Sequence, residues 1–67
     1  MLSARNQLKA RVTSVKVGTV MAEVVAHVGD IELVSVITRS SAEAMGLKAG
    51  DTVQVVIKAT EVMIAKD

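Results

Sequence analysis

The chain has 67 residues and a formal net charge of +1, and 51% of its residues are hydrophobic although it has no Phe, Trp, Tyr, Cys or Pro. The length leaves room for one domain, over residues 1–67, and the absence of Cys with a single His excludes disulfides and a structural zinc site of the usual Cys/His kind. A charge so close to zero does not suit a partner recognised mainly by its negative charge, such as nucleic acid or an anionic membrane.

The aliphatic content of the chain predicts association with further copies. A domain of this size buries only about 60% of the surface that its unfolded chain exposes. Val, Ile, Leu, Met and Ala exceed what one such core can hide, so we expect part of the surplus to face another subunit. No window approaches 18 uninterrupted apolar residues and the N-terminus lacks the apolar run of a signal peptide, so we expect a cytoplasmic location.

Three strands are predicted in the first half of the chain from alternation with a period of two. They cover Gln7–Val17, Thr19–Val28 and Ile31–Thr38, with Gly18 ending the first and Gly29-Asp30 forming a hairpin connection. The predicted faces group Leu8, Ala10, Val12 and Ser14 in the first strand, and Val20, Ala22, Val24, Ala26 and Val28 in the second. Aliphatic residues occur on both faces, which again indicates a subunit interface.

The pattern changes to that of a short helix between Arg39 and Leu47. Ser40-x-x-Glu43 has the form of a capping box, and Gly46 provides a C-terminal stop. We therefore expect one or two helical turns here.

Two further strands are predicted after this helix. Gly50-Asp51 forms a turn, Thr52–Ile57 alternates, and Val62–Ala65 is a short final strand. The order β-β-β-α-β-β predicts an all-β fold with one short helix, arranged as a five-stranded, partly open OB-like barrel.

Catalysis is the function class that the polar residues favour least. The chain has one histidine, His27, the residue type best suited to acid–base catalysis near neutral pH, and no partner base or nucleophile is evident beside it in the sequence. The seven carboxylates are scattered singly. We interpret His27 as a strand-end or interface residue and do not expect an enzyme.

A nucleic-acid-binding module is a second interpretation, because OB folds commonly bind single strands. Such binding uses aromatic side chains for base stacking and a basic groove. The sequence contains no aromatic residue, and its charge is nearly balanced. Fold analogy alone is therefore weak support for this function.

Hydrogen-bond donors near predicted strand and helix ends favour an oxyanion instead. A tetrahedral dianion needs hydroxyls, backbone N–H groups and one or two cations, and it needs neither an aromatic wall nor a titrating base. The simpler alternative is that the serines cap the helix and the cations lie on the surface. The donors are Ser3, Arg5, Asn6, Thr38, Ser40, Ser41, Lys58 and Thr60.

Three segments carry a more specific pattern: SARNQLK at 3–9, GTVMAEV at 18–24 and VIKATEVMI at 56–64. In these segments the chain resembles the molbindins, also called the molybdenum-pterin-binding or Mop family, which are TOBE or OB-like domains. The resemblance extends from Ser3 to about Ala65. The resemblance implies an OB-like domain that assembles as a hexamer built from dimers. It also implies binding of molybdate, and similarly of tungstate, at sites between subunits.

The resemblance assigns the donors residue by residue. It implies that molybdate is bound by Ser3, Arg5, Thr38, Ser41, Lys58 and the backbone of Ala59, and that Asn6 supports the strand instead. No residue is expected to ligate the metal directly, because the oxyanion is bound through its oxygens. The sequence departs from the family pattern at Ala10, at the short hairpin 28–30, and at Ala59, where many relatives have Ser.

Storage or homeostasis of intracellular molybdate is thus the leading hypothesis. An oligomeric OB-like scaffold without an anion, or a nucleic-acid-binding module, remains the alternative.

Overall fold

The fold was obtained as a computed structural model that describes residues 4–66. The element order is β1 (Asn6–Val17), β2 (Met21–Val28), β3 (Ile31–Thr38), α1 (Arg39–Met45), β4 (Thr52–Ile57) and the 3-10 turn η1 (Ala59–Glu61). The strands predicted at Gln7–Val17, Ile31–Thr38 and Thr52–Ile57, the short helix and the Gly29-Asp30 hairpin are confirmed, and the second strand, β2, begins at Met21 instead of Thr19. The Gly18 amide donates to the Met21 carbonyl at 2.8 Å, which closes a turn over the residues before β2.

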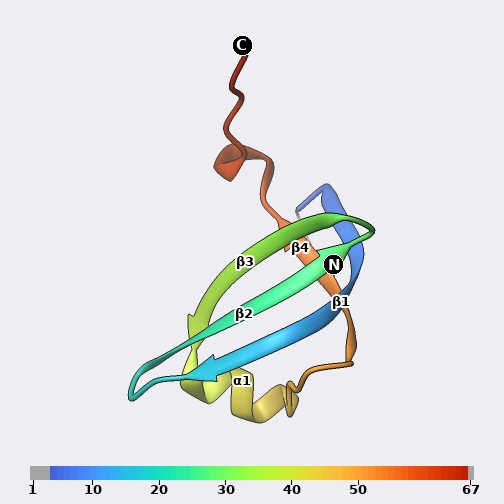
Figure 1. Cartoon of the computed structure of the whole chain (residues 1–67). Coiled ribbons are helices and arrows are strands. Elements are labelled where there is room, and N and C mark those ends of the chain that lie inside the picture. Colours follow the sequence, from blue (N-terminus) through green and yellow to red (C-terminus); the bar gives the residue numbers. More distant parts are fainter. Residues whose placement is uncertain (1–3, 67) are drawn as a thin grey trace.

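β1 is the strand that organises the sheet. The order is β3-β2-β1-β4 and all three ladders are antiparallel. The first half of β1 pairs with β4, from Asn6 opposite Ile57 to Arg11 opposite Thr52. Its second half pairs with β2, as far as Val17 opposite Ala22. Because its two halves pair on opposite edges, β1 bends and the sheet curls (Figure 1).

A β-bulge at Thr13 changes which residues of β1 face the core. Val12 pairs with Ala26, but the next partners are Ser14 with Val25, so Thr13 is the extra residue. The prediction that Ser14 shares the face of Val12 is therefore wrong, because a bulge shifts the alternation by one residue. Val15, opposite Val24, takes that face instead.

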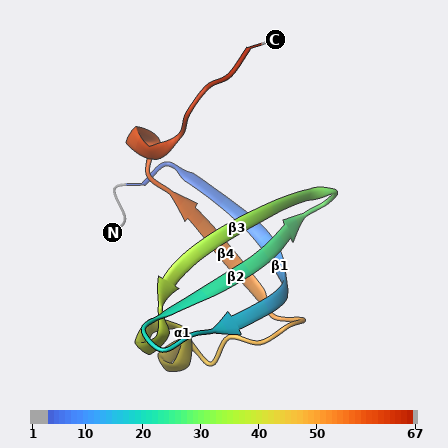
Figure 2. The same cartoon turned by 60° about the vertical axis from the view of Figure 1, so that its left-hand side comes forward.

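Helix α1 lies under one end of the curled sheet (Figures 1 and 2). Its N-cap is Thr38, whose side chain accepts the Ser41 amide, so Ser40 is a residue of the first turn. The predicted Ser40-x-x-Glu43 capping box is wrong because the helix begins two residues earlier, and Glu43 instead pairs with Arg39. Gly46 ends α1 in the left-handed region with φ 61°, as predicted.

The core is small and consists mainly of alanine. The buried apolar residues within 4–66 are Ala10, Val12, Ala22, Val24, Ala26 and Ala42. Five of them lie on the strands, on the inner side of the curled sheet, and Ala42 is the buried residue of α1, which covers one end.

The barrel is not closed within the described part of the chain, which corrects the predicted five-stranded barrel. β3 and β4 are the two free edges, and residues 62–66 form no strand. After η1 the chain leads away from the sheet, so the expected strand Val62–Ala65 has no neighbouring edge to pair with (Figures 1 and 2). The fold is thus a mostly β structure with four strands and one short helix.

Candidate functional site

Two predicted cations lie at adjacent strand ends. Arg5 directly precedes Asn6, Lys58 directly follows Ile57, and Asn6 and Ile57 are paired across the β1–β4 ladder. Arg5 and Lys58 thus each lie one residue beyond the last pair of the ladder. Like charges at neighbouring strand ends repel each other. Both side chains are exposed, and neither forms an ion pair within residues 4–66. An anion between them would remove their mutual repulsion.

Ala59 adds a backbone donor beside this cation pair. It is the first residue of η1, and the first amides of a helical turn have no partner inside the turn. The turn itself is closed by the Glu61 amide, which donates to the Lys58 carbonyl at 2.8 Å. The Ala59 amide and the two cations form the first group of donors, which we call the strand-end group.

Thr38 and Ser41 form the second group, the helix-start group. The Ser41 amide donates to Thr38 Oγ1 at 3.1 Å, and the Thr38 hydroxyl donates to Ser41 Oγ at 2.8 Å. Because Ser41 Oγ accepts the Thr38 proton, its own hydroxyl proton is free to point toward a ligand. The helix start is tied to the sheet by the Arg39 amide, which donates to the Val20 carbonyl at 2.8 Å.

One chain does not bring the two groups together. Thr38 pairs with Met21 at one end of the sheet, whereas Lys58 follows the opposite end of the β1–β4 ladder. Figure 1 places α1 and η1 at opposite ends of the molecule. A single tetrahedral anion cannot contact both groups within one chain. Ser3, the remaining predicted donor, lies outside the described residues.

Two other cations near the ends of elements, Arg39 and Lys48, have carboxylate partners close by in the sequence. Arg39 Nε lies 3.3 Å from Glu43 Oε2, and Lys48 Nζ lies 3.1 Å from Asp51 Oδ1. The hydrogen bond from the Lys48 side chain holds the pKa of Asp51 below its ordinary value, helped by the Lys48 amide. Arg39 and Lys48 are therefore less available to an anion than the two cations of the strand-end group, which have no carboxylate partner within residues 4–66.

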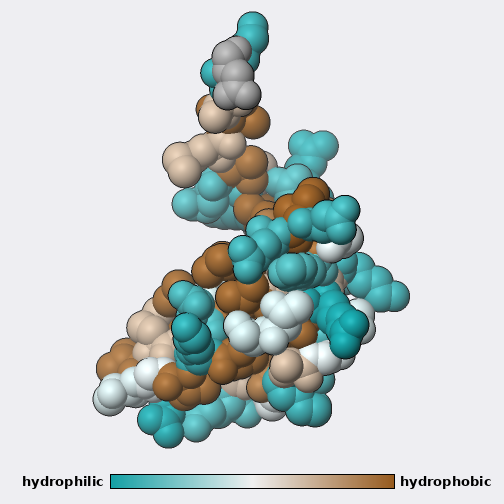
Figure 3. All heavy atoms as spheres, in the orientation of Figure 1, coloured by the Kyte–Doolittle hydropathy of each residue, from teal (hydrophilic) through white to brown (hydrophobic). Residues whose placement is uncertain are grey.

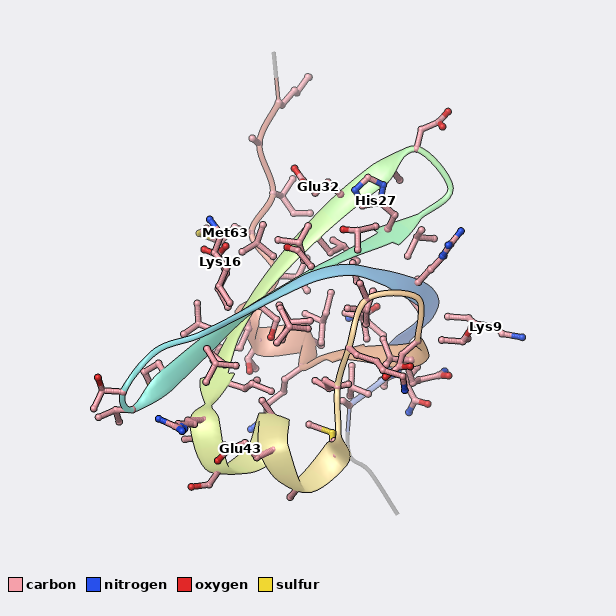
Figure 4. The ribbon with its side chains drawn as sticks, turned by 60° about the horizontal axis from the view of Figure 1, so that its bottom comes forward. Lys9, Lys16, His27, Glu32, Glu43 and Met63 are labelled. Atoms are coloured by element: carbon pink, nitrogen blue, oxygen red, sulfur yellow. The ribbon has the colours of Figure 1, made fainter. Side chains whose placement is uncertain are left out.

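His27 belongs to neither donor group. It pairs with Arg11 on β1 and with Glu32 on β3, several residues along the strands from both groups. Its Nε2 atom is 3.9 Å from Glu32 Oε1 on the neighbouring strand (Figure 4). This cross-strand pair is partly exposed and resembles a surface contact more than a catalytic dyad. No group of three or more His, Cys, Asp or Glu side chains that could hold a metal ion occurs within residues 4–66.

One polar hollow was not predicted from the sequence. It lies beside the β-bulge and is lined by Arg11, Thr13, His27 and the backbone of Gly29 and Gly50. It forms because the Gly50 amide donates to the Val12 carbonyl and thereby holds the loop before β4 against the bulge. No local sequence signal indicates this contact, since it joins segments almost forty residues apart.

No helix of the described part, residues 4–66, is long and apolar enough to cross a membrane.

Comparison with known proteins finds one family model and several close relatives. The TOBE domain model matches residues 2–64. Molybdenum-pterin-binding protein 3 of Clostridium pasteurianum is 48% identical over 64 residues, which are 94% of each chain. Molybdenum-pterin-binding protein 1 of the same organism is 45% identical over the same share of both chains.

Two solved structures share the fold along nearly the whole chain. A molybdate-binding protein from Sporomusa ovata aligns with a TM-score of 0.95 and 41% identity over 98% of each chain. MopII from Clostridium pasteurianum aligns with a TM-score of 0.90 and 43% identity, over 98% of this chain and 100% of the other.

Proposed function

The chain belongs to the TOBE-domain family, with molybdenum-pterin-binding proteins among its relatives, and from this premise we propose that it binds molybdate for intracellular storage and homeostasis. The observation that carries the proposal is the unpaired cation pair Arg5 and Lys58 at adjacent strand ends. It occurs in a chain whose relatives are named for molybdenum or molybdate binding. The proposal covers residues 1–67 as one binding domain.

The donor chemistry suits a tetrahedral dianion. Arg5 and Lys58 offset its two negative charges, and hydroxyl and amide groups replace the water that surrounds its oxygens in solution. Charge-assisted hydrogen bonds of this kind are the stronger ones in proteins, about 1.5–3 kcal/mol each. Tungstate has the same shape and charge, so it binds the same site. Sulfate has the same charge but is smaller, and cavity size discriminates against it.

We place the anion between subunits. The strand-end group, with Ser3 as a further donor, comes from one chain, and the helix-start group comes from its neighbour. This division is supported by the separation of the two groups within one chain. The assembly we propose is a homo-oligomer, a hexamer built from dimers, in the cytoplasm. The site works by binding alone, so the protein is not an enzyme.

Isothermal titration with molybdate and a native mass measurement on the same sample test the proposal. We expect saturable molybdate binding by an oligomer, with tungstate competing and a large excess of sulfate leaving the binding intact. An oligomer that takes up neither molybdate nor tungstate contradicts the storage function and supports the scaffold alternative. If sulfate competes for the site as well as tungstate does, a site that selects its anion by size is contradicted.

A further inference from the structure

The polar hollow beside the β-bulge lies apart from both donor groups. Arg11 and His27 line it and are paired across the β1–β2 ladder. Arg11 also pairs with Thr52, at the end of the β1–β4 ladder that is farthest from the strand-end group. Figure 3 shows mostly hydrophilic residues on the side of the body where the first half of β1 lies, and hydrophobic residues gathered on the opposite side. We call this cavity the bulge hollow.

Backbone hydrogen bonds frame the bulge hollow. The Val12 amide donates to the Asp51 carbonyl and the Gly50 amide donates to the Val12 carbonyl, both at 2.8 Å, so the loop before β4 is fixed to β1. The Thr13 hydroxyl donates to the Val25 carbonyl at 3.2 Å, which ties the bulge to β2. Because these bonds lie within one chain, the hollow is formed before any ligand binds, which lowers the cost of binding.

Three hydrogen-bond donors around the bulge hollow have no acceptor within residues 4–66. The Arg11 side chain forms no ion pair and donates no hydrogen bond there. Gly29 and Ala49 also line the hollow, each as the second residue of a tight turn, and their amides donate to no acceptor in that part of the chain. Guanidinium and amide groups only donate, so a ligand that satisfies them must be an acceptor.

The charge of the bulge hollow fits a monoanion. Arg11 supplies one fixed positive charge, whereas His27 is charged only when it is protonated. The nearest carboxylate to His27 is Glu32, whose Oε1 atom lies 3.9 Å from Nε2, and Glu32 does not line the hollow. Arginine binds a carboxylate through two parallel hydrogen bonds. The strand-end group differs, because its two cations match the two charges of a dianion.

The size of the bulge hollow calls for more than a carboxylate group. Its volume is about 480 Å³, within the range of about 300–1,000 Å³ that is usual for small-molecule sites. Its lining residues also offer apolar groups, namely the methyl groups of Ala49 and Thr13 and the methylene groups of Arg11. A ligand with a carboxylate and an apolar body uses both kinds of surface.

We propose that the bulge hollow binds a small organic carboxylic acid, as a site separate from the molybdate site. The carboxylate lies on the Arg11 guanidinium and the amides of Gly29 and Ala49, and the body of the ligand packs against the loop before β4. The ligand thereby links the β2–β3 hairpin to this loop. The site rests on residues of one chain and does not require molybdate binding.

Protonation of His27 strengthens the binding, because it adds a second positive charge beside the carboxylate. Among the surrounding group types, only a histidine ordinarily changes its charge between pH 6 and pH 8. Affinity for a carboxylate should therefore be higher at pH 6 than at pH 8. The other charged groups around His27 are Arg11 on β1, Glu32 on β3, Asp30 in the hairpin, and the Lys48–Asp51 pair in the loop before β4.

Titration with benzoate, followed by nuclear magnetic resonance of the full-length protein, tests the site. Benzamide has nearly the same shape without the charge and is the matched control ligand. We expect saturable shifts of the Gly29 and Ala49 amides and of the His27 ring, with benzamide binding at least about 10-fold more weakly. Equal binding of benzamide, or shifts that leave these three residues unchanged, would overturn the proposal. Acetate should bind more weakly than benzoate, and equal affinity would contradict a packed ligand body.

Substitutions separate the roles of the two side chains. Arg11→Gln should weaken benzoate binding about 10-fold, and Arg11→Lys should recover part of the loss. His27→Gln should bind benzoate at pH 8 about as well as the unsubstituted protein and should lose the gain at pH 6.

Lys9→Gln is the matched control, because Lys9 lies on the same strand, does not line the hollow and points away from the body (Figure 4). Unchanged affinity in Arg11→Gln, or an equal loss in Lys9→Gln, would contradict binding at the hollow. Amide spectra of each variant show whether it is folded.

A second titration keeps this site distinguishable from the molybdate site. Molybdate should leave benzoate affinity within about twofold, and Arg11→Gln should keep its molybdate affinity. Displacement of benzoate by equimolar molybdate would overturn the proposal, since the hollow would then be an oxyanion site. If benzoate binds and molybdate does not, the storage function fails and the carboxylate site stands.

Discussion

Thr38 and Ser41 are joined by two hydrogen bonds at the start of α1, and the two bonds have different roles. The Ser41 amide donates to Thr38 Oγ1 at 3.1 Å, which is the helix N-cap. The Thr38 hydroxyl donates to Ser41 Oγ at 2.8 Å, which orients the serine hydroxyl. Stability and anion binding can therefore be separated by substituting one residue at a time.

We expect Thr38→Val to lower the free energy of unfolding by about 1 kcal/mol, because it removes the cap acceptor. Ser41→Ala keeps the cap and removes one hydroxyl donor. We expect it to leave stability nearly unchanged and to weaken molybdate binding about 10-fold. Denaturant unfolding without ligand and isothermal titration measure the two effects.

Ser40→Ala is the matched control for Ser41→Ala, since it removes an exposed hydroxyl from the first turn of α1 that is not part of the cap. It should change neither quantity. Equal loss of affinity in both serine variants would mean that the helix start acts through its structure rather than through the Ser41 hydroxyl.

Substitutions of Arg5 and Lys58 should weaken molybdate binding without lowering the stability of the ligand-free protein. Without ligand, Arg5→Gln or Lys58→Gln removes like-charge repulsion, so neither variant should lose stability. With molybdate, each should bind about 10- to 100-fold more weakly, because a charge-assisted hydrogen bond is lost. Titration at two salt concentrations measures the affinity, and thermal unfolding of the ligand-free protein measures the stability.

Lys9→Gln is the control for the cation pair, because it removes the same charge from an exposed position on β1. Its affinity for molybdate should stay within about twofold of the unsubstituted protein. Unchanged affinity in both Arg5→Gln and Lys58→Gln would favour a scaffold that keeps the fold without the anion.

The features that the sequence predicted well depend on local chemistry. The hairpin at Gly29, the strand Ile31–Thr38 and the stop at Gly46 each follow from residues a few positions apart. The bulge at Thr13 was not predictable in this way. It depends on the loop before β4, where the Val12 amide donates to the Asp51 carbonyl at 2.8 Å.

Two predictions could not be resolved from the sequence of a single chain: the strand at Val62–Ala65 and the arrangement of the candidate site. The alternation of residues 62–65 predicts a strand, but a strand needs a neighbouring edge, and its own chain offers none within reach. A wider set of donors was predicted from positions near strand and helix ends, and the resemblance selected among them and added the backbone of Ala59. Their division between two ends of the sheet became visible only from the ladders of β1 and β3.

Gly46→Ala tests the left-handed cap of α1. A Cβ atom at this position meets nothing within 4 Å, so any cost is conformational and comes from φ 61°. We expect a loss of about 1 kcal/mol for alanine, and a smaller loss for Gly46→Asn, because Asn tolerates this region better. Denaturant midpoints at one fixed protomer concentration measure both. Equal losses for the two variants would contradict a purely conformational origin.

Acid sensitivity should depend on Asp51. The hydrogen bond from the Lys48 side chain lowers the pKa of Asp51 in the folded chain. A lowered folded pKa stabilises the protein at pH values above the unfolded pKa of about 3.9, and this contribution is lost as the pH falls through the folded pKa.

Asp51→Asn keeps an oxygen acceptor for the Lys48 amide but removes the charge. We expect it to be less stable than the unsubstituted protein at pH 6, with the difference shrinking below about pH 4. Unfolding curves at both pH values measure this difference, with Asp30→Asn in the β2–β3 hairpin as the control. A difference that does not change with pH, or one that Asp30→Asn reproduces, would contradict the role of the Lys48–Asp51 pair.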